Sequence, residues 1–110
     1  MTNTELINIL KTLEASTTNP IKVFSVRAPL GTKLPYLTVL FNDTDNVFAD
    51  DKVYKTEQAI TLELYTVNKD ETSESCVETV LDNNQLPWNK DEAYDDEGQF
   101  YITYYYLTRR

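Results

Sequence analysis

Residues 99–110 read QFYITYYYLTRR, a strand-like stretch that holds the densest group of aromatic side chains in the chain. Five aromatic rings fall within the seven residues from Phe100 to Tyr106. Aromatic residues favour β-strands, and side chains alternate between the two faces of a strand. We therefore predict a strand over 99–108 with two apolar or aromatic faces. One face carries Phe100, Ile102, Tyr104 and Tyr106, and the other carries Tyr101, Thr103, Tyr105 and Leu107.

Three earlier segments are also predicted strands. Residues 21–26 are short and β-branched, and residues 36–41 alternate between two sets of side chains. Residues 58–67 show the clearest alternation, which indicates one buried and one wetter face. The connection over 86–98 is polar and either irregular or a short further strand. The alternating sets in 58–67 are Ile60, Leu62 and Leu64 against Thr61, Glu63 and Tyr65.

Two helices are predicted from apolar side chains at helical spacing. The first begins at a capping box formed by Thr2 and Glu5, and the second covers about 70–82. The predicted buried stripes are Leu6, Ile9, Leu10 and Leu13 in the first helix, and Cys76, Val77, Val80 and Leu81 in the second. The predicted wet face of the second helix carries Glu71, Glu74 and Glu78.

These elements predict a single α+β domain over residues 1–110. The order α-β-β-β-α-β(-β) favours a two-layer sandwich, in which two helices cover one face of a mainly antiparallel sheet of four to five strands. The second sheet face is then left without cover from the same chain. Because tyrosine tolerates both water and a dry contact, the simplest cover is another copy of the protein.

Composition narrows the function. The chain has 110 residues and a net charge of −8, which opposes a general affinity for nucleic acid. The only cysteine, Cys76, fits a reducing compartment, and Glu5 lies in an N-terminal segment that lacks the basic start of a signal peptide. Synthesis in the cytoplasm is expected, and no apolar run is long enough to span a membrane.

Catalytic chemistry is hard to find in these residues. The chain has no histidine, so the commonest general base is missing. Cys76 falls on the apolar stripe of a helix, where a small buried side chain is expected rather than a nucleophile. The two glycines, Gly31 and Gly98, are too far apart to form a phosphate-binding loop. We expect no enzyme and no cofactor.

Acidic pairs raise the alternative of a metal site. Asp43 and Asp45 have the spacing of a calcium loop but lack its glycine and its terminal glutamate. Asp50 and Asp51, and the run at 95–97, are adjacent charges that usually lie solvated in loops. We expect no metal site.

The predicted elements come in the same order as those of a known family, and several segments of the sequence resemble it. The segments are LPYLTVLFNDTDNVFADDKVY (34–54), ITLELYTVNKDE (60–71), SESCVETVLDNN (73–84), LPWNKDEAY (86–94) and QFYITYYYL (99–107). In these segments the chain resembles the tail-terminator proteins, also called tail-completion or head–tail joining proteins, of long-tailed bacteriophages and prophages.

The resemblance implies a virion structural protein at the head–tail junction, made in the cytoplasm of the bacterial host. Such proteins form a ring, commonly a hexamer, that caps the tail tube and docks to the head connector proteins, while DNA passes through without specific binding. We predict Phe48, Tyr101 and Tyr105 as subunit interface. The acidic residues predicted to line the lumen are Asp43, Asp45, Asp50 and Asp51.

A second function from another class fits the same small size and acidity. An acidic protein can imitate DNA and so inhibit a DNA-binding protein. Such mimics present carboxylates in rows that resemble a duplex, whereas the acids here concentrate in loops and on one helix. Self-association into rings separates the first function from a monomer that binds a repressor or nuclease.

Overall fold

The computed structural model describes residues 2–17, 19–41 and 58–109. Eight elements follow one another along the chain. They are α1 (Asn3–Leu10), the 3₁₀ helix η1 (Lys11–Ala15), β1 (Lys22–Ser25), β2 (Tyr36–Phe41), β3 (Gln58–Thr66), α2 (Glu71–Asn83), β4 (Trp88–Asp95) and β5 (Phe100–Arg109).

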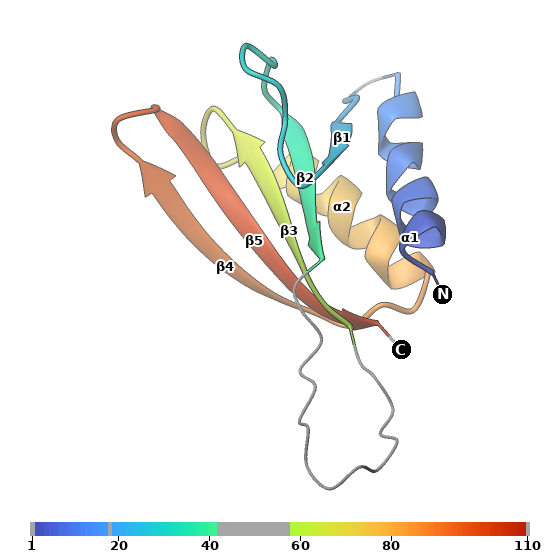
Figure 1. Ribbon diagram of the computed structural model, residues 1–110. Coiled ribbons are helices and arrows are strands. Elements are labelled where there is room, and N and C mark those ends of the chain that lie inside the picture. The colour runs from blue at the N-terminus through green and yellow to red at the C-terminus, as the bar shows by residue number, and fades with distance from the viewer. Residues whose placement is uncertain (1, 18, 42–57, 110) are drawn as a thin grey trace, which may run out of the picture.

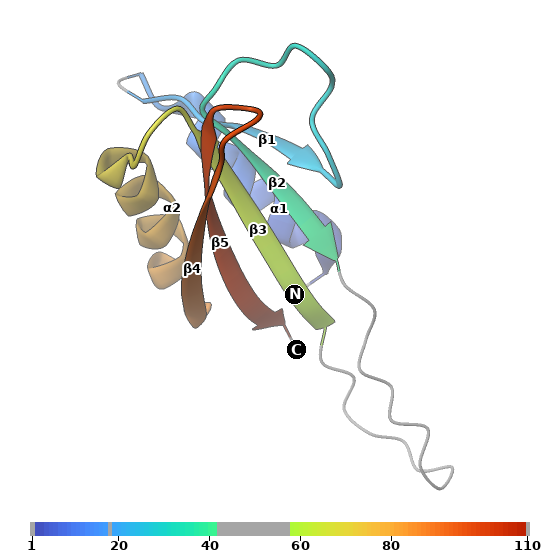
Figure 2. The same ribbon diagram turned by 90° about the vertical axis from the view of Figure 1, so that its left-hand side faces the viewer.

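The strands form one sheet in the order β1-β2-β3-β5-β4, and α1 and α2 lie on the same side of it (Figure 1). The predicted α+β fold and its element order are confirmed. Three of the four strand pairs are antiparallel, but β1 pairs with β2 in parallel. The connection over 26–35 runs from the end of β1 back to the start of β2, so the two strands point the same way (Figure 2).

Both helices begin where the sequence provides a cap. The Thr2 hydroxyl accepts from the Glu5 amide and the Glu5 carboxylate accepts from the Thr2 amide, as the capping box predicts. The Asp70 carboxylate accepts from the amide and the hydroxyl of Ser73 at the start of α2. These contacts satisfy backbone donors that have no partner inside the helix.

One apolar core joins the two helices to the sheet. Leu6, Leu10 and Leu13 of the first helical region, with Val77 and Leu81 of α2, are buried as predicted. Cys76 and Val80 are only partly buried and pack on the edge of this core. The sheet residues in the core are Val23, Leu37, Val39, Ile60, Leu62, Leu64, Tyr105 and Leu107.

The largest structural feature that the sequence left open is β4. It runs for eight residues and pairs with β5 along its whole length. Its six central residues are all exposed, so it lacks the apolar alternation that marks a half-buried strand. Its pairing with β5 is closed by a turn in which the Asp95 carboxylate accepts from the amides of Glu97 and Gly98.

Leu62 tests the core because it lies in the central region of β3 and is fully buried. We expect Leu62→Ala to lower the free energy of unfolding by about 2–5 kcal/mol, through lost apolar transfer and the cavity left behind. Urea unfolding followed by circular dichroism measures this. Leu30→Ala, at a fully exposed position, is the control and should change stability by no more than about 0.5 kcal/mol. Equal effects of the two changes would contradict the assigned core.

Candidate functional site

The sheet face opposite the helices carries two groups of aromatic side chains in ring contact. No helix or strand of the described residues covers this face (Figure 1). The rings of Tyr36 and Tyr65 stack with centroids 4.7 Å apart, and Phe100 lies 5.4 Å from Tyr65. Tyr104 stacks on Tyr106 at 6.3 Å. We call this surface the aromatic face, and its members are Phe24, Tyr36, Tyr65, Phe100, Ile102, Tyr104 and Tyr106.

A single carboxylate, that of Glu63, lies among these rings. Its Oε1 accepts a hydrogen bond from the Thr38 hydroxyl at 3.0 Å and another from the Tyr65 hydroxyl at 2.9 Å. Burial raises the pKa of Tyr65 well above its usual value, and the hydrogen bond and charge of Glu63 raise it further. The aromatic face therefore combines apolar rings with a fixed negative charge.

Strand β4 adds two more carboxylates beside the aromatic face. Asp91 pairs with Tyr104, and Asp95 pairs with Phe100. Residues directly opposite each other in a sheet share a face, so both acids lie on the uncovered side. Burial raises the pKa of Tyr104, and the charges of Glu63, Asp91 and Asp95 contribute to the same shift. The aromatic face thus becomes acidic towards the β4 edge of the sheet.

Two residues predicted as subunit interface lie on the opposite, helix-covered side. Tyr105 is fully buried under α2, and its hydroxyl donates to Glu78 at 2.8 Å. Tyr101 lies beneath the ammonium of Lys69, 5.7 Å from the ring centroid, and bonds to Glu92. The alternation of β5 is as predicted, but Tyr105 belongs to the core, because the helices cover the side that carries it. The interface role of Tyr101 stays a prediction.

The remaining predicted site residues cannot be placed in this way. Phe48 lies outside the described residues, and so do the four carboxylates predicted to line a lumen, Asp43, Asp45, Asp50 and Asp51. Of the acidic run at 95–97, Asp95 closes the turn after β4. Within the described ranges, no group of three or more side chains could hold a metal ion.

A cluster of ion pairs ties α2 to β4 on the helix-covered side. Glu74 Oε1 accepts from Lys69 Nζ and from Lys90 Nζ, each at 2.9 Å. Lys90 also bonds Glu78 at 3.0 Å, and Lys69 also bonds Glu92. The prediction that Glu74 faces water was wrong, since its side chain is 4% exposed beneath these lysines. Helical spacing alone could not show that β4 crosses this part of α2.

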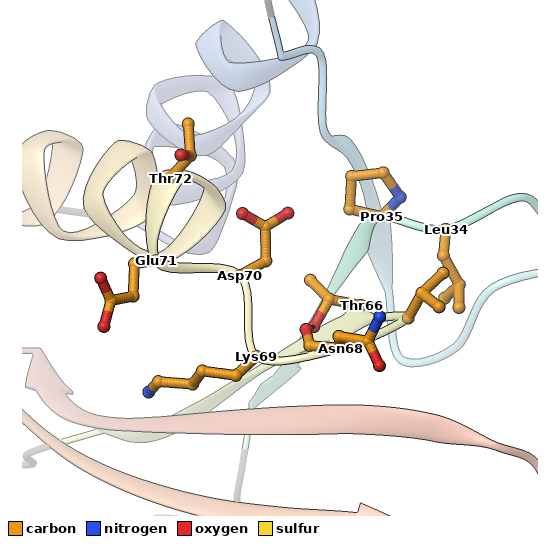
Figure 3. A pocket seen from close by; sticks show the side chains of 9 residues that line it. Leu34, Pro35, Thr66, Asn68, Lys69, Asp70, Glu71 and Thr72 are labelled. Carbon is orange, nitrogen blue, oxygen red and sulfur yellow. Dashed lines mark hydrogen bonds between the residues drawn. The ribbon is translucent and has the colours of Figure 1, made fainter.

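A depression of about 540 Å³ lies between the 34–35 loop and the start of α2 (Figure 3). Figure 3 shows Thr66, Asn68, Lys69 and Asp70 around it. The groups in it already have partners, because Thr66 donates to the Asn68 carbonyl and Asp70 caps α2. The depression offers no nucleophile paired with a base, so the aromatic face is the better candidate for a functional surface.

Comparison with known proteins leaves the family open. No family model matches the chain, and no curated protein matches its sequence. None of the described helices has the length and apolar character needed to cross a membrane.

Alkaline titration tests the buried position of Tyr105. Burial, with the hydrogen bond to Glu78, raises its pKa far above the usual value of about 10. The folded state then keeps a proton that the unfolded state releases, so stability should be intact below about pH 10 and fall as pH rises beyond it. In Tyr105→Phe this fall should be shallower. Urea unfolding across alkaline pH measures the slope, and an unchanged slope would contradict the burial of this hydroxyl.

Proposed function

We propose that this chain is a virion structural protein of a long-tailed bacteriophage or prophage, a tail-terminator or head–tail joining subunit. In this role it assembles into a ring that caps the tail tube and docks to the head connector. The observation that supports self-association is the aromatic face, which no helix or strand of the described residues covers. The resemblance along the chain supports the more specific role.

The chemistry of the aromatic face suits a contact that forms after folding. Tyr36, Tyr65 and Tyr104 are half-buried, while Tyr106 keeps 43% of its surface exposed. Such rings present a large apolar area together with a hydroxyl that can bond water or a partner. Contiguous aromatic surface rimmed by polar groups is typical of protein–protein contacts. A neighbouring subunit is the partner that this proposal assigns to it.

The proposal gives the chain no catalytic activity, no cofactor and no metal. Its partners are further copies of itself, the tail tube protein and the head connector proteins, and its place is the head–tail junction of the virion. Carboxylates at the lumen would repel the phosphates of passing DNA. That part of the proposal concerns Asp43, Asp45, Asp50 and Asp51, which lie outside the described residues.

The alternative of an acidic DNA mimic fits the described carboxylates less well. Glu74, Glu78 and Glu92 are bonded to lysines of the same chain. Glu63 is bonded to two hydroxyl groups among aromatic rings. Carboxylates held in this way are poorly placed to imitate a row of phosphates.

Assembly is measured by light scattering together with electron microscopy, at high concentration and with purified tail tubes. We expect rings, such as a particle of six 12.7 kDa chains, which the family resemblance favours. A protein that stays monomeric under both conditions and binds a repressor or nuclease tightly would instead support the DNA mimic.

The aromatic face is tested by Tyr104→Ser combined with Tyr106→Ser. Because both rings lie on the uncovered face, we expect association to weaken by about tenfold or more while the fold persists. Tyr94→Ser is the matched control, since Tyr94 is 52% exposed and its partner in the sheet is Tyr101, on the other face. Equal loss of association in the pair and the control would contradict the assigned surface. Thermal unfolding of each variant reports the fold.

A further inference from the structure

Two stretches of the described chain, at opposite edges of the sheet, carry opposite net charge. Residues 11–36, which contain η1 and the edge strand β1, hold four basic residues and one acidic residue, Glu14. Residues 86–98, which contain the opposite edge strand β4, hold one lysine and five carboxylates. We call the four basic residues the basic margin, and they are Lys11, Lys22, Arg27 and Lys33.

The basic margin has no ionic partner among the described residues. All described ion pairs involve Lys69 or Lys90, which lie on the helix-covered side. Glu14, the only acid in the same stretch, accepts a hydrogen bond from the backbone amide of Val23 at 2.8 Å. As far as residues 2–17, 19–41 and 58–109 are concerned, the basic margin is therefore left to meet an acidic surface outside its own subunit.

The acidic surface lies at the opposite end of the uncovered face. In the strand register Glu63 and Asp91 flank Tyr104, and Asp95 lies opposite Phe100 on the same face. Lys90, the only basic residue of β4, turns away from this surface to Glu74 and Glu78. Electron-rich tyrosine rings beside carboxylates are well suited to receive lysine and arginine side chains.

The two surfaces cannot meet within one subunit, because β1 and β4 are the two edge strands of the same sheet. We propose that the basic margin of one copy covers the acidic part of the aromatic face, around Tyr104 and Tyr106, of the next copy. This inference rests on the proposed ring function and specifies its contact. A contact between two different patches repeats head to tail, and it closes into a ring when the rotation allows.

Side chains carry this contact, and the two sheets do not join into one. On the outer side of β1, the Val23 amide donates to Glu14, and the nearby Ile21 amide donates to the Leu13 carbonyl at 3.1 Å. These bonds occupy donors that an added strand would need. A contact made by charged side chains weakens as salt is added, so the rings should loosen with rising ionic strength.

The experiment exchanges the charges of the two surfaces. The first variant combines Lys22→Glu with Arg27→Glu. The second places lysines at three exposed β4 positions whose sheet partners belong to the aromatic face, Asn89→Lys, Asp91→Lys and Ala93→Lys. The net charge changes by equal and opposite amounts, so the chain with all five changes keeps the wild-type net charge.

We expect each variant alone to associate about tenfold or more weakly than wild type. An equimolar mixture of the two should recover association, since each then offers the complement of the other. The chain with all five changes should also form rings by itself. Analytical ultracentrifugation gives the association constants, and circular dichroism shows whether each variant folds.

The outcomes separate this contact from the proposed function. If wild type forms rings but neither the mixture nor the five-change chain recovers them, the ring uses other surfaces and the inference fails alone. If wild type forms no rings even with tail tubes, both fail. If a charge variant does not fold, a crosslinking experiment takes its place. Ser25→Cys and Ala93→Cys, each made in a Cys76→Ala background, are mixed and treated with a short bis-maleimide. Crosslinked dimers that contain one of each variant support the contact, and their absence overturns it.

Discussion

The packing of α2 against the middle of β5 decides which side of the sheet becomes core. The Tyr105 ring meets Trp88 edge-on at 5.5 Å, and its hydroxyl reaches Glu78 on the helix. Because successive strand side chains point to opposite faces, this contact turns Tyr104 and Tyr106 away from the helices. The uncovered aromatic surface is a direct result of a well-satisfied buried tyrosine one position away.

Much of this fold follows from local patterns in the chain. The capping box at Thr2 and Glu5 and the alternation of residues 58–66 act over a few residues, and both are present as predicted. The parallel pairing of β1 with β2 is not a local property, because it depends on the path of the 26–35 connection. Strand β4 escaped clear prediction because exposed polar residues at its centre leave no hydrophobic period to detect.

The candidate surface was predictable in composition but not in orientation. Alternation in residues 99–108 correctly divides β5 into two sets of side chains. Both sets are rich in aromatic residues, so hydrophobicity could not decide which set the helices bury. Pairing with β3 places the Tyr105 set beside the buried Ile60, Leu62 and Leu64. Glu78 of α2 then accepts from the buried Tyr105 hydroxyl. The burial of Glu74 depends in the same way on Lys90, a residue distant in sequence.

Charged side chains are distributed unevenly between the two faces of the sheet. Lys69 and Lys90 neutralise carboxylates on the helix-covered side, while the acids beside the aromatic face have no such described partner. Of the β4 carboxylates, Asp91 and Asp95 are therefore displayed on the same side as the tyrosine rings. A surface that is both apolar and charged selects its partner by sign as well as by shape.

The ion pairs between β4 and α2 also connect the outer strand to the helix layer. Strand β4 has a strand neighbour on one edge only, and an outer strand held by backbone bonds alone can be peeled away one bond at a time. Lys90 spans Glu74 and Glu78, which are one helical turn apart, so pulling on β4 also pulls on α2. A force applied to this outer strand is therefore transmitted through the ion pairs to α2 and to the core beneath it.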